Sequence, residues 1–459
     1  MKMKNLITKL LYLAGFLLLL ISCDSFVETD LPKSQLNNEA VFEDYATATA
    51  ALTDIYSKIR DNGMLNGNGI PVQLGSYTDE TDSFQSPSSP SEAFYQNRLL
   101  PSSPTIQDWW NVAYNQIYAA NSLIEGVQNS KNLSEQNKKQ LQGEALFIRA
   151  LIHFYLVNLF GDIPYVVETD YRNNSKIPRT STQNIYNNLI ADLQNASSML
   201  PETYSPAQRV RPNKFTARAL LARVYLYNNQ FTEAANEASA VLNQTGLFSL
   251  EPDLDQVFLI NSRETIWQLQ SANAGENTVE GSIFIFVSGP PVLALTENFV
   301  NSFSDTDLRK SNWINSVTDD STIWYHAFKY KERSNTPASV EYSVQFRLAE
   351  QYLIRAEARA HLGNLGGARE DLNKIRERAG LGQTTAQSQT EILNAILQER
   401  RWELFSEPGH RFFDLKRFGQ LDNILSAVKP GWNSEDRIFP IPQNELNANP
   451  NLLPQNPGY

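Results

Sequence analysis

Apolar residues recur three and four positions apart along most of the chain, which places them on one face of a helix. This pattern predicts helices over residues 39–61, 106–129, 134–160, 182–199, 213–228, 231–243, 345–362, 365–379, 389–405 and 411–427. Some of these segments begin with a residue suited to a helix N-terminus, such as Ser134 or Thr182. The sequence therefore predicts a mainly α fold.

Two pairs of the predicted helices share a spacing of small residues. Ala222 lies twelve positions before Ala234, and Ala356 lies twelve positions before Ala368, with a short polar or glycine-containing turn inside each pair. Small residues at this spacing let two antiparallel helices approach closely. The pattern is similar to the tetratricopeptide hairpin, whose stacked copies form a superhelix. An ordinary α-hairpin is the alternative, and the shared register of two copies favours the repeat.

Two long segments, residues 62–105 and 247–342, interrupt the helical pattern. The first is rich in Gly, Pro and Ser, and the second contains the strand-like runs TIWQLQ (265–270) and SIFIFV (282–287). Both are too long to be simple connections, and long loops in a compact body usually carry function. We therefore expect a tetratricopeptide-like superhelix with loop-rich insertions that carry a few short strands. The proline-rich segment 428–459 is expected to lie extended across this body.

The chain begins with a basic segment and a short apolar run. Lys2, Lys4 and Lys9 are the only charged residues before Asp24, and the apolar run from Leu10 ends near residue 21. A helix that spans a bilayer needs about 20 apolar residues, so this run is too short. A basic start followed by a short apolar run is typical of a secretory signal peptide, which we place at residues 1–22.

The only cysteine of the chain follows this run. Residues 20–23, Leu-Ile-Ser-Cys, resemble a bacterial lipobox, so we expect cleavage before Cys23 and acylation of its thiol. Each buried methylene contributes about 0.8 kcal/mol, so several acyl chains would hold the protein firmly in outer-membrane lipid. Residues 23–37 would then form a lipidated polar tether, and residues 38–459 a single domain.

The formal net charge of the chain is −11, and removal of a lysine-bearing signal peptide would make it more negative. This charge argues against binding to nucleic acid or to anionic lipid. A single cysteine also excludes an intrachain disulfide, so buried residues alone must stabilise the fold.

Motifs for catalysis or for metal binding are missing from the sequence. The four histidines have no metal-ligand spacing, and there is no HExxH, CxxC pair, GxSxG, Walker loop or GxGxxG after a strand. These histidines are His153, His326, His361 and His410. We therefore expect no enzymatic activity, no cofactor and no metal. Composition alone leaves a glycosidase with two carboxylates open.

Long blocks of the sequence resemble the signature blocks of the SusD/RagB family, in the order of that family. They are GEALFIRALIHFYLVNLFGDIPYV (143–166), TENFVNSFSDTDLR (296–309), FRLAEQYLIRAEARAHLG (346–363), LNKIRERAGL (372–381), ERRWELFSEPGHRFFDLKRFG (399–419) and FPIPQNELNANPNLLPQNPGY (439–459). The resemblance implies a lipid-anchored outer-membrane protein of Bacteroidetes that faces the cell exterior. Such a protein binds an oligosaccharide or polysaccharide and sits on a SusC-like TonB-dependent transporter without catalysis. It also implies that the repeat face packs against the transporter and that the insertions carry the sugar site.

Two other functions stay open. Some members of the RagB branch handle peptides, so a RagB-like lipoprotein of a TonB-dependent peptide importer is the main alternative. A lipoprotein glycosidase is the third hypothesis, which sustained product release would support.

Most charged and aromatic residues of the signature blocks are expected to be structural. A network of buried or half-buried ion pairs is predicted for Glu399, Arg400, Glu403, Arg411, Asp414 and Arg417. The aromatic residues at helical spacing are expected in the core, namely Trp109, Trp110, Trp402, Phe405, Phe412 and Phe413.

The sugar site is expected in the insertions. Aromatic rings stack on the apolar faces of sugars, and Asp, Asn or Arg side chains bind hydroxyl pairs. The candidate ligand-binding residues are Trp313, Trp324, Tyr77, Asp79, Tyr325, Tyr95 and Asn97, of which the first four are the strongest. Further side chains of the same kind are Phe84, Phe94, Asn315 and His326. The acidic chain favours a neutral glucan or fructan, although basic pairs such as Arg309-Lys310 could reverse this locally.

Overall fold

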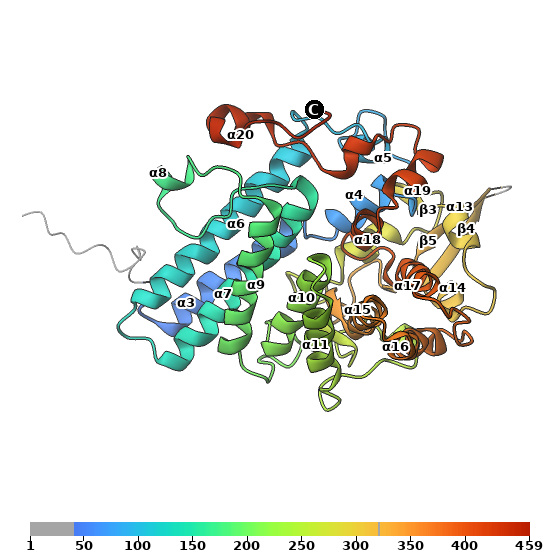
Figure 1. Cartoon of the computed structure of the whole chain (residues 1–459), viewed down its shortest axis with the longest axis horizontal. Coiled ribbons are helices and arrows are strands. Elements are labelled where there is room, and N and C mark those ends of the chain that lie inside the picture. Colours follow the sequence, from blue (N-terminus) through green and yellow to red (C-terminus); the bar gives the residue numbers. More distant parts are fainter. Residues whose placement is uncertain (1–40, 320–321) are drawn as a thin grey trace, which may run out of the picture. The chain divides into compact units, whose positions relative to one another are not determined.

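Helices dominate the structure, a computed structural model that describes residues 41–319 and 322–459 (Figure 1). Residues 42–459 form one compact unit. The signal peptide predicted for residues 1–22, the acylation site Cys23 and the tether 23–37 lie outside the described residues. The prediction of a mainly α fold is confirmed.

Nearly all the predicted helices form close to their expected bounds. The long helices are α3 (Tyr45–Asp61), α6 (Pro104–Asn129), α7 (Glu135–Phe160), α9 (Thr182–Met199), α10 (Lys214–Tyr227), α11 (Phe231–Leu242), α15 (Leu348–His361), α16 (Leu365–Arg378) and α17 (Gln389–Leu404). The helix expected at 345–362 starts at Leu348 because residues 345–347 complete the strand β6 (Ser343–Arg347).

The long helices pack in sequence as a superhelix of hairpins. Each of α6, α7, α9, α10 and α11 packs against the next, and α11 packs against α15, which in turn contacts α16 and α17. Ala222, Ala234, Ala356 and Ala368 are fully buried where the helices of the two hairpins meet. The two hairpins therefore lie side by side although the second insertion separates them in the chain. The tetratricopeptide-like arrangement is confirmed.

Helix α7 is the central helix of the core. Among the described helices it alone is long and apolar enough to cross a membrane, but the whole of its apolar window is buried inside the protein. The charged side chains of its fully buried stretch, residues 143–160, are paired: Glu144 binds Arg211, and Arg149 binds Asp192 through two hydrogen bonds of 2.8 and 2.6 Å. Burial of this stretch by protein, with Glu144 and Arg149 both paired, identifies α7 as a core helix.

The prediction of one continuous helix over residues 411–427 is wrong. The chain instead forms α18 (His410–Arg417) and α19 (Leu421–Val428). Gly419 separates them with φ of +65°, a left-handed conformation that glycine adopts without steric cost and that ends a helix.

The insertions contain more structure than their composition suggested. The first holds α4 (Ile70–Tyr77), β1 (Thr81–Ser83) and α5 (Glu92–Tyr95). The second holds η2 (Leu254–Gln256), β2 (Thr265–Leu269), α12 (Val279–Phe284), β3 (Leu293–Leu295), α13 (Glu297–Asn301), α14 (Leu308–Asn312), β4 (Ile314–Asp319) and β5 (Thr322–Ala327). The prediction of a strand at SIFIFV (282–287) is wrong, because residues 282–284 belong to α12. The Thr278 side chain accepts the Gly281 N–H and caps that helix.

The C-terminal segment crosses the end of α7. It contains η3 (Ser434–Arg437), α20 (Gln443–Ala448) and η4 (Pro450–Leu452), and α8 (Tyr171–Asn174) is the remaining short helix. The Phe439 N–H donates to Leu159 O at 2.7 Å, and Asn456 Nδ2 donates to Phe160 O at 2.8 Å. These bonds fix the segment to the carbonyl groups that a helix C-terminus leaves unpaired.

The ion-pair network predicted for the signature blocks is confirmed. The pairs are Glu399 with Arg309 and Arg376, Glu403 with Arg309, Arg347 and Arg378, Asp414 with Arg400 and Arg417, and Arg411 with Asp79. The expected core aromatics Trp109, Trp110, Phe405, Phe412 and Phe413 are buried, and Trp402 is partly buried with its Nε1–H donating to Ser302 Oγ.

Candidate functional site

A four-stranded sheet joins the two insertions. Its strand order is β1-β3-β5-β4, so β1 of the first insertion pairs with β3 of the second. Thr81 lies opposite Leu295 and Ser83 opposite Leu293, while Leu295 also lies opposite Tyr325 of β5. Segments about 200 residues apart in the chain therefore meet in one sheet.

The sheet has an inner and an outer face, because successive side chains of a strand point to opposite sides. The inner face carries Leu293, Leu295, Tyr325 and Ala327, which pack on a core cluster that includes Trp313. Residues directly opposite in an antiparallel pair share a face. The outer face, as defined here by register, therefore carries Asp82, Ala294, Trp324, His326, Asn315 and Val317.

One part of the outer face is covered and another part is open. The Phe286 ring lies 4.8 Å from the His326 ring and covers it, so His326 is buried. Trp324 and Val317 are half-buried, and Asn315 is exposed. The far edge of the Trp324 ring lies beside Gly289, where an added Cβ would come within 3.7 Å. Residues 286–289 therefore run along this face and support one edge of Trp324.

A hydrogen-bonded pair lies at the β1 edge of the outer face. The half-buried Tyr95 hydroxyl donates to Asp82 Oδ1 at 3.2 Å, and Lys429 Nζ lies 3.8 Å from the centre of the Tyr95 ring. Burial, reinforced by the Asp82 charge, raises the pKa of Tyr95 to about 12, so its hydroxyl stays protonated. Asp82 and Tyr95 thus offer acceptor and donor groups for sugar hydroxyls.

Phe84 extends the same edge. Its N–H donates to Val292 O at 2.9 Å, which continues the β1–β3 pairing by one residue, and its side chain is 44% exposed. By alternation it shares the face of Asp82. Strands β1 and β5 are separated by β3, which sets Phe84 and Trp324 at least about 10 Å apart. A ligand that touches both must therefore be longer than one small ring.

The structure buries four of the predicted ligand residues. Trp313 is fully buried with its Nε1–H donating to Leu254 O at 3.0 Å, contrary to the expected exposure. Tyr77 is also fully buried, and its hydroxyl donates to Asp436 O. Asn97 donates from Nδ2 to Tyr77 O, and Asp79 is paired with two arginines. These side chains fix each insertion internally and fasten the first one to α17, α18 and the C-terminal segment.

The remaining three predicted residues lie at the sheet. Trp324 belongs to the outer face. Tyr95 is hydrogen-bonded to Asp82 of the same face, whereas Tyr325 belongs to the inner face. Asp82 was missed by sequence reasoning because β1 has only three residues, too few to show alternation.

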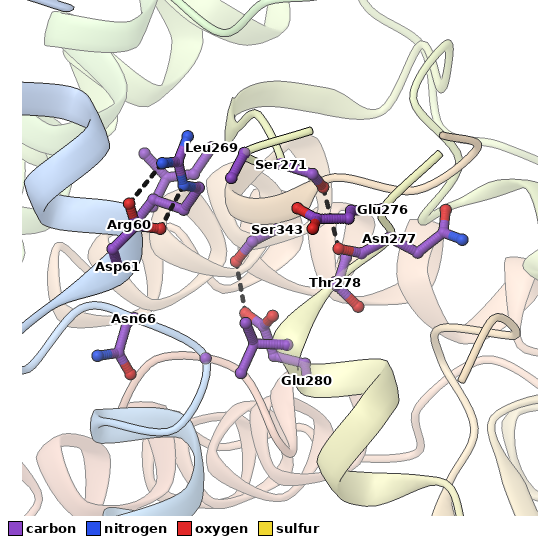
Figure 2. A pocket seen from close by; sticks show the side chains of 13 residues that line it. Arg60, Asp61, Asn66, Leu269, Ser271, Glu276, Asn277, Thr278, Glu280 and Ser343 are labelled. Carbon is purple, nitrogen blue, oxygen red and sulfur yellow. Dashed lines mark hydrogen bonds and ion pairs between the residues drawn. The ribbon is translucent and has the colours of Figure 1, made fainter. Parts of the chain in front are cut away.

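A small hollow lies where the end of α3 and the first insertion meet the second insertion (Figure 2). It encloses about 80 Å³ between the end of α3 and the start of α12. Its polar side chains bond one another: Arg60 with Asp61, and Ser343 with Glu280. Pockets that hold small molecules span roughly 300–1,000 Å³, so this hollow is too small for an oligosaccharide.

The sequence matches two models of one family. A model described as starch-binding and associating with the outer membrane matches residues 32–226, and a model of the SusD family matches residues 263–459. SusD-like protein P2 of Formosa agariphila is 28% identical, over 96% of this chain and 98% of its own length. The starch-binding protein SusD of Bacteroides thetaiotaomicron is 22% identical, over 72% of this chain and 75% of its own.

The fold also matches solved structures. One, described as a laminarin-binding SusD-like protein, is 25% identical with a TM-score of 0.78, covering 90% of this chain and 99% of its own. The match therefore extends over the helical hairpins and both insertions. The chain belongs to the SusD/RagB family.

Proposed function

We propose that this protein captures an oligosaccharide or polysaccharide on the outer face of the β1-β3-β5-β4 sheet. The observation that carries the proposal is the grouping of Trp324, Phe84 and the Asp82–Tyr95 pair on one partly exposed face. Aromatic side chains suit the apolar faces of sugars, and the carboxylate and hydroxyl suit sugar hydroxyls. Two similar proteins, the starch-binding SusD and a laminarin-binding SusD-like protein, support the same ligand class.

The charge of this face favours a neutral glycan. Asp82 contributes a negative charge, and the whole chain carries −11. A uronate or a sulfated sugar would be repelled at this edge. We therefore expect a neutral polysaccharide such as a glucan or fructan to bind there, without cleavage.

The setting proposed for this capture is the cell surface. Acylation of Cys23 would anchor the protein in the outer membrane, which agrees with the family description of association with that membrane. From there it would pass the ligand to a SusC-like TonB-dependent transporter. Radioactive palmitate should label the protein in cells, and Cys23→Ala should abolish the label; equal labelling of both would contradict the anchor.

Affinity electrophoresis tests the ligand class. The purified full-length protein should be retarded in native gels that contain laminarin, starch or inulin, relative to gels without polysaccharide. It should release no reducing ends from the polysaccharide that retards it. Binding to a peptide pool with no retardation by any polysaccharide would favour the peptide-importer alternative. Sustained release of reducing ends would show a glycosidase instead.

A further inference from the structure

A larger hollow, here called the arginine pocket, lies among α13, α17, α18 and α19, which gather in one part of the structure (Figure 1). It encloses about 560 Å³, within the range of pockets that bind small molecules. It is far larger than the hollow of Figure 2. Its size makes it a candidate for a second ligand.

Two guanidinium groups share one carboxylate in this pocket. Arg411 binds Asp79 through two hydrogen bonds, Nε to Oδ1 at 2.7 Å and Nη2 to Oδ2 at 2.8 Å. Arg401 reaches the same carboxylate with Nη2 alone, at 2.8 Å from Oδ2. Asp79 is the only acid among the described residues that line the pocket. One positive charge is therefore left without a matching negative charge in the lining.

The neighbouring acid does not supply that charge at neutral pH. Glu80 follows Asp79 and is buried. Burial, and then the charge of Asp79, raise the pKa of Glu80 to about 8, so its carboxyl is mostly protonated at pH 7. The Asp414 carboxylate beyond Arg411 is already bound by Arg400 and Arg417.

Two buried donors of the lining have no partner among the described residues. They are Arg401 Nε and Gln398 Nε2, three residues apart on α17 and so on one face of that helix. A buried donor without an acceptor costs about 1–3 kcal/mol, so such groups in native proteins usually have a partner. Both need an acceptor. Around them, exposed amides of Asn298, Asn394 and Asn423 add donors without adding charge.

We propose that the arginine pocket binds a carboxylate group of a small ligand, with Arg401 and Gln398 as donors to it. A carboxylate brings both the acceptors and the negative charge that the pocket lacks, and its geometry matches a guanidinium. It can come from an acidic sugar or from an amino acid or peptide. The proposal does not depend on glycan binding at the outer face of the sheet.

Isothermal titration calorimetry of the full-length protein tests the proposal with three probes at low salt: glucuronate, glucose and N-acetylglutamate. Glucuronate, N-acetylglutamate or both should bind at least tenfold more tightly than glucose. Binding of glucuronate alone assigns the carboxylate to an acidic sugar, and binding of N-acetylglutamate alone assigns it to an amino acid. Equal affinity for glucose and both acids, or binding of none, overturns the proposal.

Two variants locate the site. Asn394→Asp adds a like charge at an exposed rim position and should weaken carboxylate binding at least tenfold without lowering the melting temperature. Arg401→Gln should weaken it similarly, while Arg411 still holds Asp79 through two bonds. If Arg401→Gln fails to fold, carboxylate binding by Asn394→Asp decides whether the site lies in the arginine pocket.

The matched control is Asn315→Asp, the same change at an exposed position of the outer face. It should leave carboxylate binding unchanged. Unchanged binding in Asn394→Asp, or equal loss in Asn394→Asp and Asn315→Asp, overturns the assignment. Trp324→Ala should also leave carboxylate binding unchanged, which separates this proposal from the glycan proposal.

Discussion

Tyr325 of β5 lies opposite Leu295 of β3, and this pair sets which side chains of the second insertion face the core. Both side chains face the core, so the neighbouring Trp324 must face outward. Leu295 also lies opposite Thr81, and Asp82 therefore points to the same side as Trp324. The two pairings of Leu295 thus place the ligand candidates of both insertions on one face.

The two tryptophans of the β4–β5 region should differ in their effect on stability. Trp313 is fully buried against Phe258 and Lys329, so Trp313→Ala should cost about 3–5 kcal/mol of unfolding free energy. Trp324 is half-exposed, and Trp324→Ala should cost about 1 kcal/mol or less. Urea denaturation measures both values. Equal losses would mean that Trp324 is a core residue and not part of a ligand surface.

Removal of one buried acid should destabilise the ion-pair network strongly. Burial alone would raise the pKa of Glu403, but Arg378, Arg347 and Arg309 hold it well below its usual range. Glu403→Gln leaves these guanidinium groups without their shared partner, so unfolding free energy should fall by about 3–5 kcal/mol.

Chemical denaturation should show this loss, and the exposed Glu135, which pairs with Lys138 on the same helix, supplies the matched control. Glu135→Gln should change stability little, because exposed ion pairs contribute little. Similar midpoints for Glu403→Gln and wild type would contradict the structural role of the network.

Glu80 should make stability depend on pH. Burial raises its pKa to about 8, whereas in the unfolded chain it ionises near 4.5. The folded protein therefore retains a proton that the unfolded chain releases in this interval. The stability that this group contributes is fully present below about pH 4.5 and is lost as pH rises through about 8.

The variant Glu80→Gln stays neutral throughout this pH range. Its melting temperature should exceed that of wild type by a margin that grows from about pH 5 to pH 8, in scanning calorimetry at matched ionic strength. At about pH 4, where Glu80 is protonated in the folded and in most of the unfolded protein, its ionisation should cause little difference between the two melting temperatures. A margin that does not grow with pH would show that Glu80 is ionised in the folded protein.

Helix positions could be predicted well from the sequence because the apolar spacing is local. The pairs Ala222–Ala234 and Ala356–Ala368 even indicated the hairpin packing, and all four residues are fully buried. Gly419 ended a helix without a visible change in that spacing, which is why 411–427 was predicted as one helix.

The ligand surface could be predicted only in part. Gly, Pro and Ser around Tyr77 suggested an exposed loop, but α4 is buried on every side by segments far along the chain, including Phe412 and Phe439. Asp79 pairs with Arg401 across 322 positions, a partnership that no local pattern reveals. Trp324 was found because an aromatic residue in a loop-rich insertion has fewer core partners than one on a helix.

The most direct measurement of the central claim is calorimetric titration of Trp324→Ala with the neutral polysaccharide that retards wild type. The matched control is Ile323→Ala, which removes an apolar side chain that is 54% exposed and lies on the opposite side of the same strand. The account predicts at least tenfold weaker binding for Trp324→Ala and wild-type binding for Ile323→Ala, with both proteins folded. Undiminished affinity in Trp324→Ala would contradict the claim that the outer face of the sheet binds the glycan.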